Sequence, residues 1–417
     1  MAVAPEVFVA FLFVTFYNNK MEREDTGMTR RNMLQATTAV LMLLFILGCG
    51  LPAFAGQNSD AALKKEIEQL KGRINLLEEK VGEGQQERSL LPGLPGMDVA
   101  GGISGGAFYA TNPGAGESDN DFLLSNFLVE LSSRDNNLPI SFCAAFGETS
   151  TPSLLDPPEN NSDFDIEYAS VTLQMTGSLS LETGLLQPNT GYEDTYTYNN
   201  ANIVCSVTGS QQPYNAYGAR LAWDAAESIS LYAGYYSTRL DDEEYRVDLG
   251  GGVFLDAGDS WEAGLTASIG GFDVSVYNYH LNRLRNLAGL VVERTVGDIY
   301  MAVNVDYWRW DNTMKFYYKN GRHSATACAL YVDPRFGKFS IPLRLEYINQ
   351  GSSMIYGDNS NTDRIYTATI TPTYNFSDNT YVRVEASYVS ADFAFADQDG
   401  YVKDKRSYLA AEMGYCF

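Results

Sequence analysis

Hydrophobic and polar positions alternate in short runs from residue 100 to the end of the chain. In the stretch FSIPLRLEYIN, Leu343, Leu345 and Tyr347 fall at every second position, and Arg344 and Glu346 fall between them. Successive side chains of a β-strand point to opposite faces, so this period of two predicts a strand with one apolar and one polar face. Sixteen such runs, each of about ten residues, follow one another, and no helical period interrupts them.

The connections between these runs alternate between short and long. Short turns such as TGS and VGD are followed by polar stretches such as 187–213, 239–257 and 390–406. An even number of strands with short turns at one end and long loops at the other is the plan of an outer-membrane barrel. We therefore predict an all-β fold, a transmembrane antiparallel up-and-down β-barrel of about 16 strands over residues 100–417. A soluble β protein is the alternative.

The chain ends in the run SYLAAEMGYCF, which has the same period of two. Leu409, Ala411, Met413, Tyr415 and Phe417 fall on one face of the predicted strand. We interpret this run as the strand that closes the barrel. Tyr415 and Phe417 are expected to lie in the aromatic girdle at the membrane interface and to form the C-terminal signature of such barrels.

The polar faces of the strands are expected to point inward, because an arginine facing lipid near the bilayer midplane costs about 2–4 kcal/mol. About sixteen strands leave an aqueous channel rather than a filled core. The predicted pore-lining residues are Arg220, Glu262, Asp306, Arg344, Glu346, Arg383 and Glu385. Glu182, Asp273 and Glu412 add to the acids on this face, so acids outnumber bases and the pore is expected to prefer cations mildly.

The first 55 residues read as a targeting region. From Met28, two arginines, an apolar core and the small residues AFA follow in the order of a secretory signal peptide, which predicts cleavage after Ala55. A twin-arginine signal and a lipoprotein signal ending at Cys49 are weaker alternatives. Residues 1–27 carry a second apolar run and are interpreted as the product of an upstream start site. The signal peptide therefore spans 28–55.

Residues 56–84 carry a heptad pattern with charged residues between its apolar positions. Three heptads are marginal as a lone helix in water, so the segment predicts a short coiled-coil helix with a partner. The segment is expected to hold a homotrimer together, and the alternative is one amphipathic helix against the barrel or in its mouth. Residues 85–99 form a linker that contains LLPGLPG. The apolar seam consists of Leu63, Ile67, Leu70, Ile74, Leu77 and Val81.

Composition narrows the function. The net charge of −23 argues against a nucleic-acid partner, and the mean hydropathy of −0.20 is compatible with a barrel because alternating strands give a weak hydropathy signal. The chain has two histidines and five cysteines, and no pair has the spacing of metal ligands. We expect no enzyme, no metal and no cofactor. Cys143 and Cys205 form a disulfide or remain free thiols; the sequence leaves both open.

Residues 178–223 resemble the OmpL-like family of outer-membrane β-barrel porins. The resemblance rests on a strand that runs into Pro188, Gly191 and Glu193, an asparagine-rich stretch, then Pro213 and a strand with Gly218. It implies an outer-membrane pore without catalytic residues.

Residues 187–213 are the longest loop and the third long one in the strand count. In general porins the third loop folds into the lumen, so by resemblance this loop is the candidate constriction; capping of the outer mouth is the alternative. Its predicted constriction residues are Tyr192, Glu193, Asp194, Tyr196 and Tyr198.

Taken together, these patterns predict an integral outer-membrane porin for small hydrophilic solutes and ions, surrounded by outer-membrane lipid and lipopolysaccharide. A structural or adhesive barrel without an open pore is the alternative.

Overall fold

The structure, a computed structural model, divides into two compact units, residues 1–95 and 96–417. It describes residues 97–114, 120–133, 139–149, 152–154, 164–213, 215–237, 246–248, 254–256, 258–311, 324–349, 364–396 and 399–417. The predicted signal peptide, coiled-coil helix and nearly all of the linker lie outside the described residues and stay predictions.

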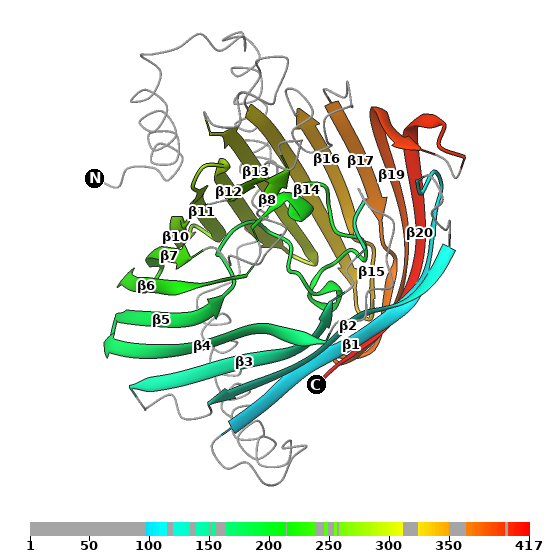
Figure 1. Ribbon diagram of the computed structural model, residues 1–417. Coiled ribbons are helices and arrows are strands. Elements are labelled where there is room, and N and C mark those ends of the chain that lie inside the picture. The colour runs from blue at the N-terminus through cyan, green and yellow to red at the C-terminus, as the bar shows by residue number, and fades with distance from the viewer. Residues whose placement is uncertain are drawn as a thin grey trace, which may run out of the picture. The chain divides into compact units, whose positions relative to one another are not determined.

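The described residues form strands almost throughout (Figure 1). The first nine are β1 (Met97–Ala110), β2 (Asn120–Ser133), β3 (Ile140–Thr149), β4 (Asp165–Thr176), β5 (Leu179–Leu186), β6 (Ala216–Ala226), β7 (Ile229–Ser237), β8 (Arg246–Asp248) and β9 (Phe254–Asp256). The others are β10 (Ser260–Ile269), β11 (Phe272–Leu281), β12 (Arg285–Val296), β13 (Ile299–Trp310), β14 (Ser324–Phe336), β15 (Phe339–Ser340), β16 (Leu343–Asn349), β17 (Arg364–Ile370), β18 (Thr373–Ser377), β19 (Thr380–Ala396) and β20 (Val402–Cys416).

Eighteen of these strands form one antiparallel sheet that closes on itself, with β1 paired to both β2 and β20. Strand β15 continues into β16, and β17 into β18, so the eighteen strands occupy sixteen positions around the barrel. The prediction of an antiparallel barrel of about 16 strands is confirmed.

Two prolines cause the interruptions within those two positions. Pro342 lies between β15 and β16, and Pro372 lies between β17 and β18; proline has no backbone N–H to give to a ladder. The sheet still continues across the gap, because the N–H of Thr371 donates to the carbonyl of Pro342 at 2.9 Å and the N–H of Val384 to that of Pro372 at 3.1 Å.

The outer face of the barrel is apolar and exposed, the reverse of a soluble β protein. In β16, Leu343, Leu345 and Tyr347 point outward, and Leu345 is 53% exposed, whereas Arg344 and Glu346 are buried inside. Apolar side chains exposed around a closed barrel and polar ones within it match the lipid-facing and lumen-facing sides of a membrane barrel.

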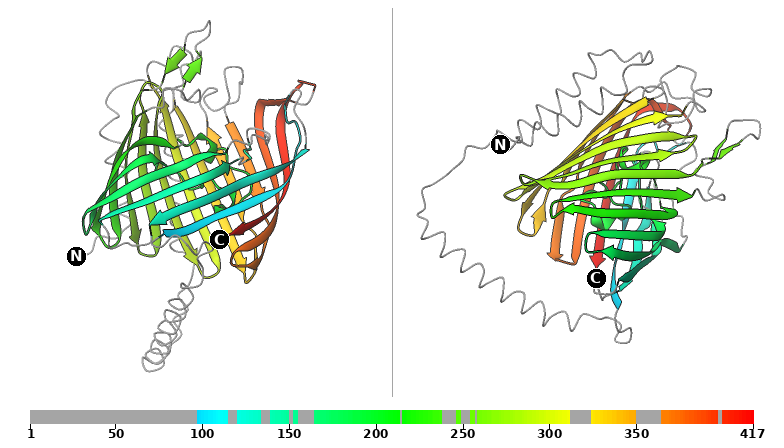
Figure 2. Two further views of the ribbon diagram at one scale, coloured as in Figure 1. Left: turned by 60° about the horizontal axis from the view of Figure 1, so that its bottom comes forward. Right: turned by 90° about the vertical axis from the view of Figure 1, so that its left-hand side faces the viewer.

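Short turns lie at one end of the barrel and long connections at the other, as predicted. The β8–β9 hairpin belongs to one of the long connections and projects beyond the neighbouring strands (Figure 2). In barrels of this plan the short turns face the periplasm. Among the described residues, no helix is both long and apolar enough to cross a membrane.

The last residue takes part in closing the barrel. The N–H of Phe417 donates to the carbonyl of Gly101 at 3.0 Å, and the N–H of Gly101 donates back to Phe417 at 3.1 Å. Leu409, Met413 and Tyr415 point outward from β20, and the rings of Tyr415 and Phe417 lie 6.2 Å apart. Their place in a membrane girdle stays a prediction.

Candidate functional site

Residues 187–213 make up most of the connection between β5 and β6 and lie inside the barrel (Figure 1). We call them the inserted segment. It holds two short 3-10 helices, η1 (Thr197–Asn199) and η2 (Gly209–Gln211), and otherwise has no regular structure. Its backbone is folded locally by Asp194, whose carboxylate accepts from the N–H of Tyr196 at 3.1 Å and from the amide of Asn199 at 2.8 Å.

Polar side chains on the inner face of the wall hold the backbone of the inserted segment. The carboxylate of Glu262 accepts from the N–H of Asn189 at 3.0 Å, and that of Glu346 accepts from the N–H of Thr208 at 2.9 Å. Glu385 accepts from the N–H groups of two successive residues of the segment, Ile203 and Val204. These carboxylates satisfy backbone donors that would otherwise be buried without a partner.

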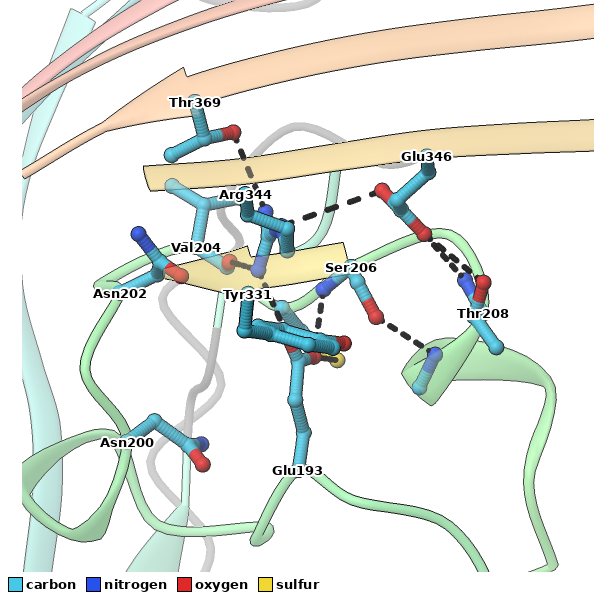
Figure 3. A network of polar contacts seen from close by, with 12 residues as sticks. Glu193, Asn200, Asn202, Val204, Ser206, Thr208, Tyr331, Arg344, Glu346 and Thr369 are labelled. Carbon is cyan, nitrogen blue, oxygen red and sulfur yellow. Dashed lines mark hydrogen bonds and ion pairs between the residues drawn. The ribbon is translucent and has the colours of Figure 1, made fainter. Parts of the chain in front are cut away.

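We call residues 187–195 the first arm of the inserted segment and residues 201–213 its second arm. Arg344 is the most completely buried of these groups and joins both arms (Figure 3). Its guanidinium, 0% exposed, lies 2.6 Å from the carboxylate of Glu193 in the first arm and donates to the carbonyl of Val204 in the second arm at 2.8 Å. Its Nε lies 3.9 Å from a carboxylate oxygen of Glu346. Arginine suits this place because its planar fork reaches several acceptors at once.

Glu193 ties the two arms to each other. One of its oxygens accepts hydrogen bonds from the guanidinium of Arg344 and from the hydroxyl of Tyr331, the latter at 3.2 Å. The other oxygen accepts from the N–H of Ser206 at 2.7 Å and contacts the Cys205 thiol at 3.4 Å (Figure 3). Burial and the Glu193 charge raise the pKa of the Cys205 thiol. Both Cys205 and Cys143 are free, so no disulfide joins them.

A second arginine binds the tip of the inserted segment, residues 196–200. Arg383 lies 2.6 Å from Glu412 and donates to the carbonyl groups of Asn200 at 2.6 Å and Thr197 at 2.7 Å. The Thr197 hydroxyl in turn donates to Asn126 at 2.7 Å. Strands β2, β19 and β20 thus meet at the tip of the segment.

A third arginine holds the start of the inserted segment. Arg220 lies 2.9 Å from Glu182 and 3.4 Å from Glu262, and donates to the carbonyl of Gln187 at 3.1 Å. At the far end, the amide of Gln212 donates to Asp306 at 3.2 Å. The segment is therefore fixed at its start, tip and end.

The structure places all seven predicted pore-lining residues on the inner face but leaves them little exposed. Arg220, Glu262, Asp306, Arg344, Glu346, Arg383 and Glu385 are 0–8% exposed. All seven contact the inserted segment. Whether any of them lines the solute path stays a prediction.

The five predicted constriction residues lie in the inserted segment in different surroundings. The ring of Tyr192 lies 4.1 Å from that of Tyr331, and burial raises the pKa of its hydroxyl to about 12. Glu193 pairs with Arg344 and Asp194 caps its own turn, as described above. The rings of Tyr196 and Tyr198 stack 5.7 Å apart. Their role as a constriction stays a prediction.

Sequence reasoning missed Asn126, which binds the tip of the segment. Strand β1 pairs with β2 through a bulge, and Ser125 and Asn126 next to it are both fully buried. In a bulge, two neighbouring residues of one strand lie opposite a single residue of the other strand, which breaks the period of two. No feature of the run FLLSNFLVEL predicts this change of register.

Inward carboxylates near the short-turn end are exposed. Asp224 of β6 and Asp273 of β11 are both exposed, and the side chain of Glu182 is 27% exposed. Asp224 and Asp273 each accept from one nearby serine. Within the described residues, no three or more His, Cys, Asp or Glu side chains are grouped so as to hold a metal ion.

Solved structures of outer-membrane channels are similar to this chain. They include the outer membrane channel DcaP of Acinetobacter baumannii, at 15% identity and a TM-score of 0.53, with 77% of this chain and 97% of that chain covered. An anion-selective porin from Comamonas acidovorans is 12% identical, with a TM-score of 0.53 and coverage of 77% and 99%. OmpT of Vibrio cholerae in its trimer form is 11% identical, with a TM-score of 0.51 and coverage of 77% and 99%.

At these identities the likeness shows the fold. No curated protein matches the sequence significantly. A family model described as "Putative beta-barrel porin-2, OmpL-like" matches residues 96–417, more than half of the chain and all of the barrel. The family and the barrel fold support the outer membrane as the location of the protein. The chain belongs to this OmpL-like family of β-barrel porins.

Proposed function

We propose that this protein is a passive diffusion porin whose solute path prefers cations. The observation that carries the proposal is the different exposure of the two signs of charge inside the barrel. Arg220, Arg344 and Arg383 are covered by the inserted segment, whereas Asp224 and Asp273 are exposed. Exposed carboxylates at a narrow passage attract cations and repel anions.

The arginines contribute little to selectivity in this proposal because their charge is already compensated. Each lies within 4 Å of a carboxylate and donates to backbone carbonyl groups of the inserted segment. The proposed solute path passes the inner face near the short turns, where Asp224 of β6 and Asp273 of β11 lie exposed.

A bilayer recording with a KCl gradient across the purified protein tests this proposal. We expect single-channel steps and a zero-current potential of the sign that K⁺ permeation gives. Asp224→Asn combined with Asp273→Asn is expected to move that potential toward zero while the conductance steps persist, because the fold does not depend on these exposed carboxylates. A potential of the chloride sign would overturn the preference. Silence from a folded barrel would favour the structural or adhesive alternative.

The proposed assembly is a homotrimer through the seam of Leu63, Ile67, Leu70, Ile74, Leu77 and Val81. It is supported by the heptad spacing and by the trimer form of OmpT, which has a similar fold. We expect the mass of the detergent-solubilised protein to be three times that of the chain. Ile67→Asp combined with Ile74→Asp is expected to lower it to one chain, and an unchanged trimer would place the contact on the barrel wall instead.

A further inference from the structure

Three tyrosines gather where the tip of the inserted segment meets the wall at β2 and β4. The rings of Tyr196 and Tyr198 stack at 5.7 Å with an interplanar angle of 13°. Tyr198 and Tyr168 of β4 pack against the same small cluster, which consists of Tyr196, Leu128 and Ala145. The cluster thus joins aromatic rings of the segment to one of the wall.

Three carboxylates surround these rings. Glu130 of β2 accepts a hydrogen bond from the hydroxyl of Tyr168. Burial raises the pKa of the Tyr198 hydroxyl, and the charges of Asp194, Glu130 and Glu167 raise it further. That hydroxyl is therefore neutral at physiological pH, and the three carboxylates make the local potential negative.

No cation of the protein compensates these carboxylates in the part of the chain that the structure describes. Elsewhere inside the barrel, arginines pair with Glu193, Glu262 and Glu412, and those carboxylates are buried. Around the tyrosines, no lysine or arginine among the described residues lies within ion-pair distance of Glu130, Glu167 or Asp194. These three side chains, with Tyr168 and Tyr198, are also partly exposed to the interior.

We infer that this tyrosine–carboxylate cage, formed by Glu130, Glu167, Tyr168, Asp194, Tyr196 and Tyr198, binds organic cations that carry an amine or guanidinium group as they pass. Aromatic rings attract cations through their faces, and a carboxylate beside them supplies the opposite charge. A guanidinium group matches both, because it stacks on aromatic rings and donates to carboxylates in a planar fork. K⁺ has no N–H group that could donate to the carboxylates.

The inference rests on the proposed porin function and names a class of solute for it. A site inside a diffusion channel must bind strongly enough to be occupied and weakly enough to release its solute. Side-chain carboxylates and aromatic rings that remain partly exposed meet that condition, whereas the fully buried pairs around Arg344 do not.

Guanidinium block of the K⁺ current through single channels tests the inference. We expect guanidinium to reduce the K⁺ current of the wild-type protein in a saturable manner at millimolar concentration. Glu130→Gln is expected to weaken the block about tenfold, the loss of one charge-assisted contact. Tyr198→Leu is expected to weaken it, whereas Tyr198→Phe keeps the ring and is expected to keep the block.

The double variant Asp224→Asn and Asp273→Asn is the matched control, because it removes two lumen carboxylates away from the cage. It is expected to shift the zero-current potential and to change the half-blocking concentration of guanidinium much less than Glu130→Gln does. Each variant is first checked for a folded barrel that conducts K⁺. The proposed cage is wrong, and the porin function is unaffected, if guanidinium does not block the K⁺ current of the wild-type protein. The same holds if guanidinium blocks Glu130→Gln as strongly as it blocks the wild-type protein. If the wild-type protein conducts nothing, the porin function itself fails.

Discussion

Replacing Arg344 with methionine is expected to free the inserted segment from the wall while the barrel stays folded. The change leaves the buried carboxylates of Glu193 and Glu346 without their cation. Breaking a buried pair by removing one partner costs about 3–5 kcal/mol, because the remaining charge stays in a poor solvent. This cost weakens the attachment of the inserted segment to the wall. It does not weaken the barrel itself, because the hydrogen bonds of β16 to its neighbouring strands are made by the backbone.

The released segment can be detected in two independent ways. We expect larger and noisier single-channel conductance in Arg344→Met than in the wild-type protein. Chymotrypsin is expected to cleave the variant within residues 187–213, where Tyr192, Tyr196 and Tyr198 become accessible, while an unheated gel still shows the folded barrel.

Arg335→Met is the matched control for this experiment. Arg335 also pairs with a carboxylate, that of Asp333, but the Arg335 side chain is 61% exposed and its ion pair lies within β14 rather than with the inserted segment, so its removal is expected to leave the attachment of the segment intact. A second variant, Arg344→Met with Glu193→Gln, is expected to recover part of the attachment because one orphan charge is gone. Wild-type conductance and protease resistance in Arg344→Met would contradict the prediction.

The strands and their faces could be predicted from the sequence because a membrane barrel repeats one local rule. Every strand has lipid on one side and the interior on the other, so the period of two in runs such as LRLEY is read directly as outside and inside. The rule fails next to Ser125 and Asn126, where the bulge in the pairing of β1 with β2 turns both residues inward.

The contacts of the candidate site could not be predicted in the same way. Glu193 and Arg344 are 151 residues apart in the chain, and only closure of the barrel brings β16 beside the inserted segment. Alternation places Arg344 inside, but it does not say whether the guanidinium meets water or a backbone carbonyl. The difference matters for function, because a covered arginine no longer acts on passing ions as an exposed one does.

A side chain at position 106 is expected to hinder closure of the barrel. Gly106 lies in β1, which pairs with β20 on one side, and a Cβ atom there would lie 1.9 Å from the carbonyl oxygen of Ala411 and 2.9 Å from the Cα of Glu412. Both neighbours are backbone, so neither can rotate away. Overpacking of this kind costs about 1–3 kcal/mol or more, and here it falls on the last pair of strands to meet.

Gly106→Ala is therefore expected to lower the ratio of folded, heat-modifiable barrel to unfolded protein after refolding in detergent by about tenfold or more. Gly177→Ala is the matched control, because a Cβ atom there would meet nothing within 4 Å. Alanine elsewhere restricts the unfolded chain and stabilises slightly, so the control is expected to fold at least as well as wild type. Equal folded fractions in the two variants would mean that β1 and β20 can separate enough to admit a methyl group. The pairing of β1 with β20 would then be flexible, and the hydrogen bonds between Gly101 and Phe417 at its short-turn end would hold the barrel closed instead.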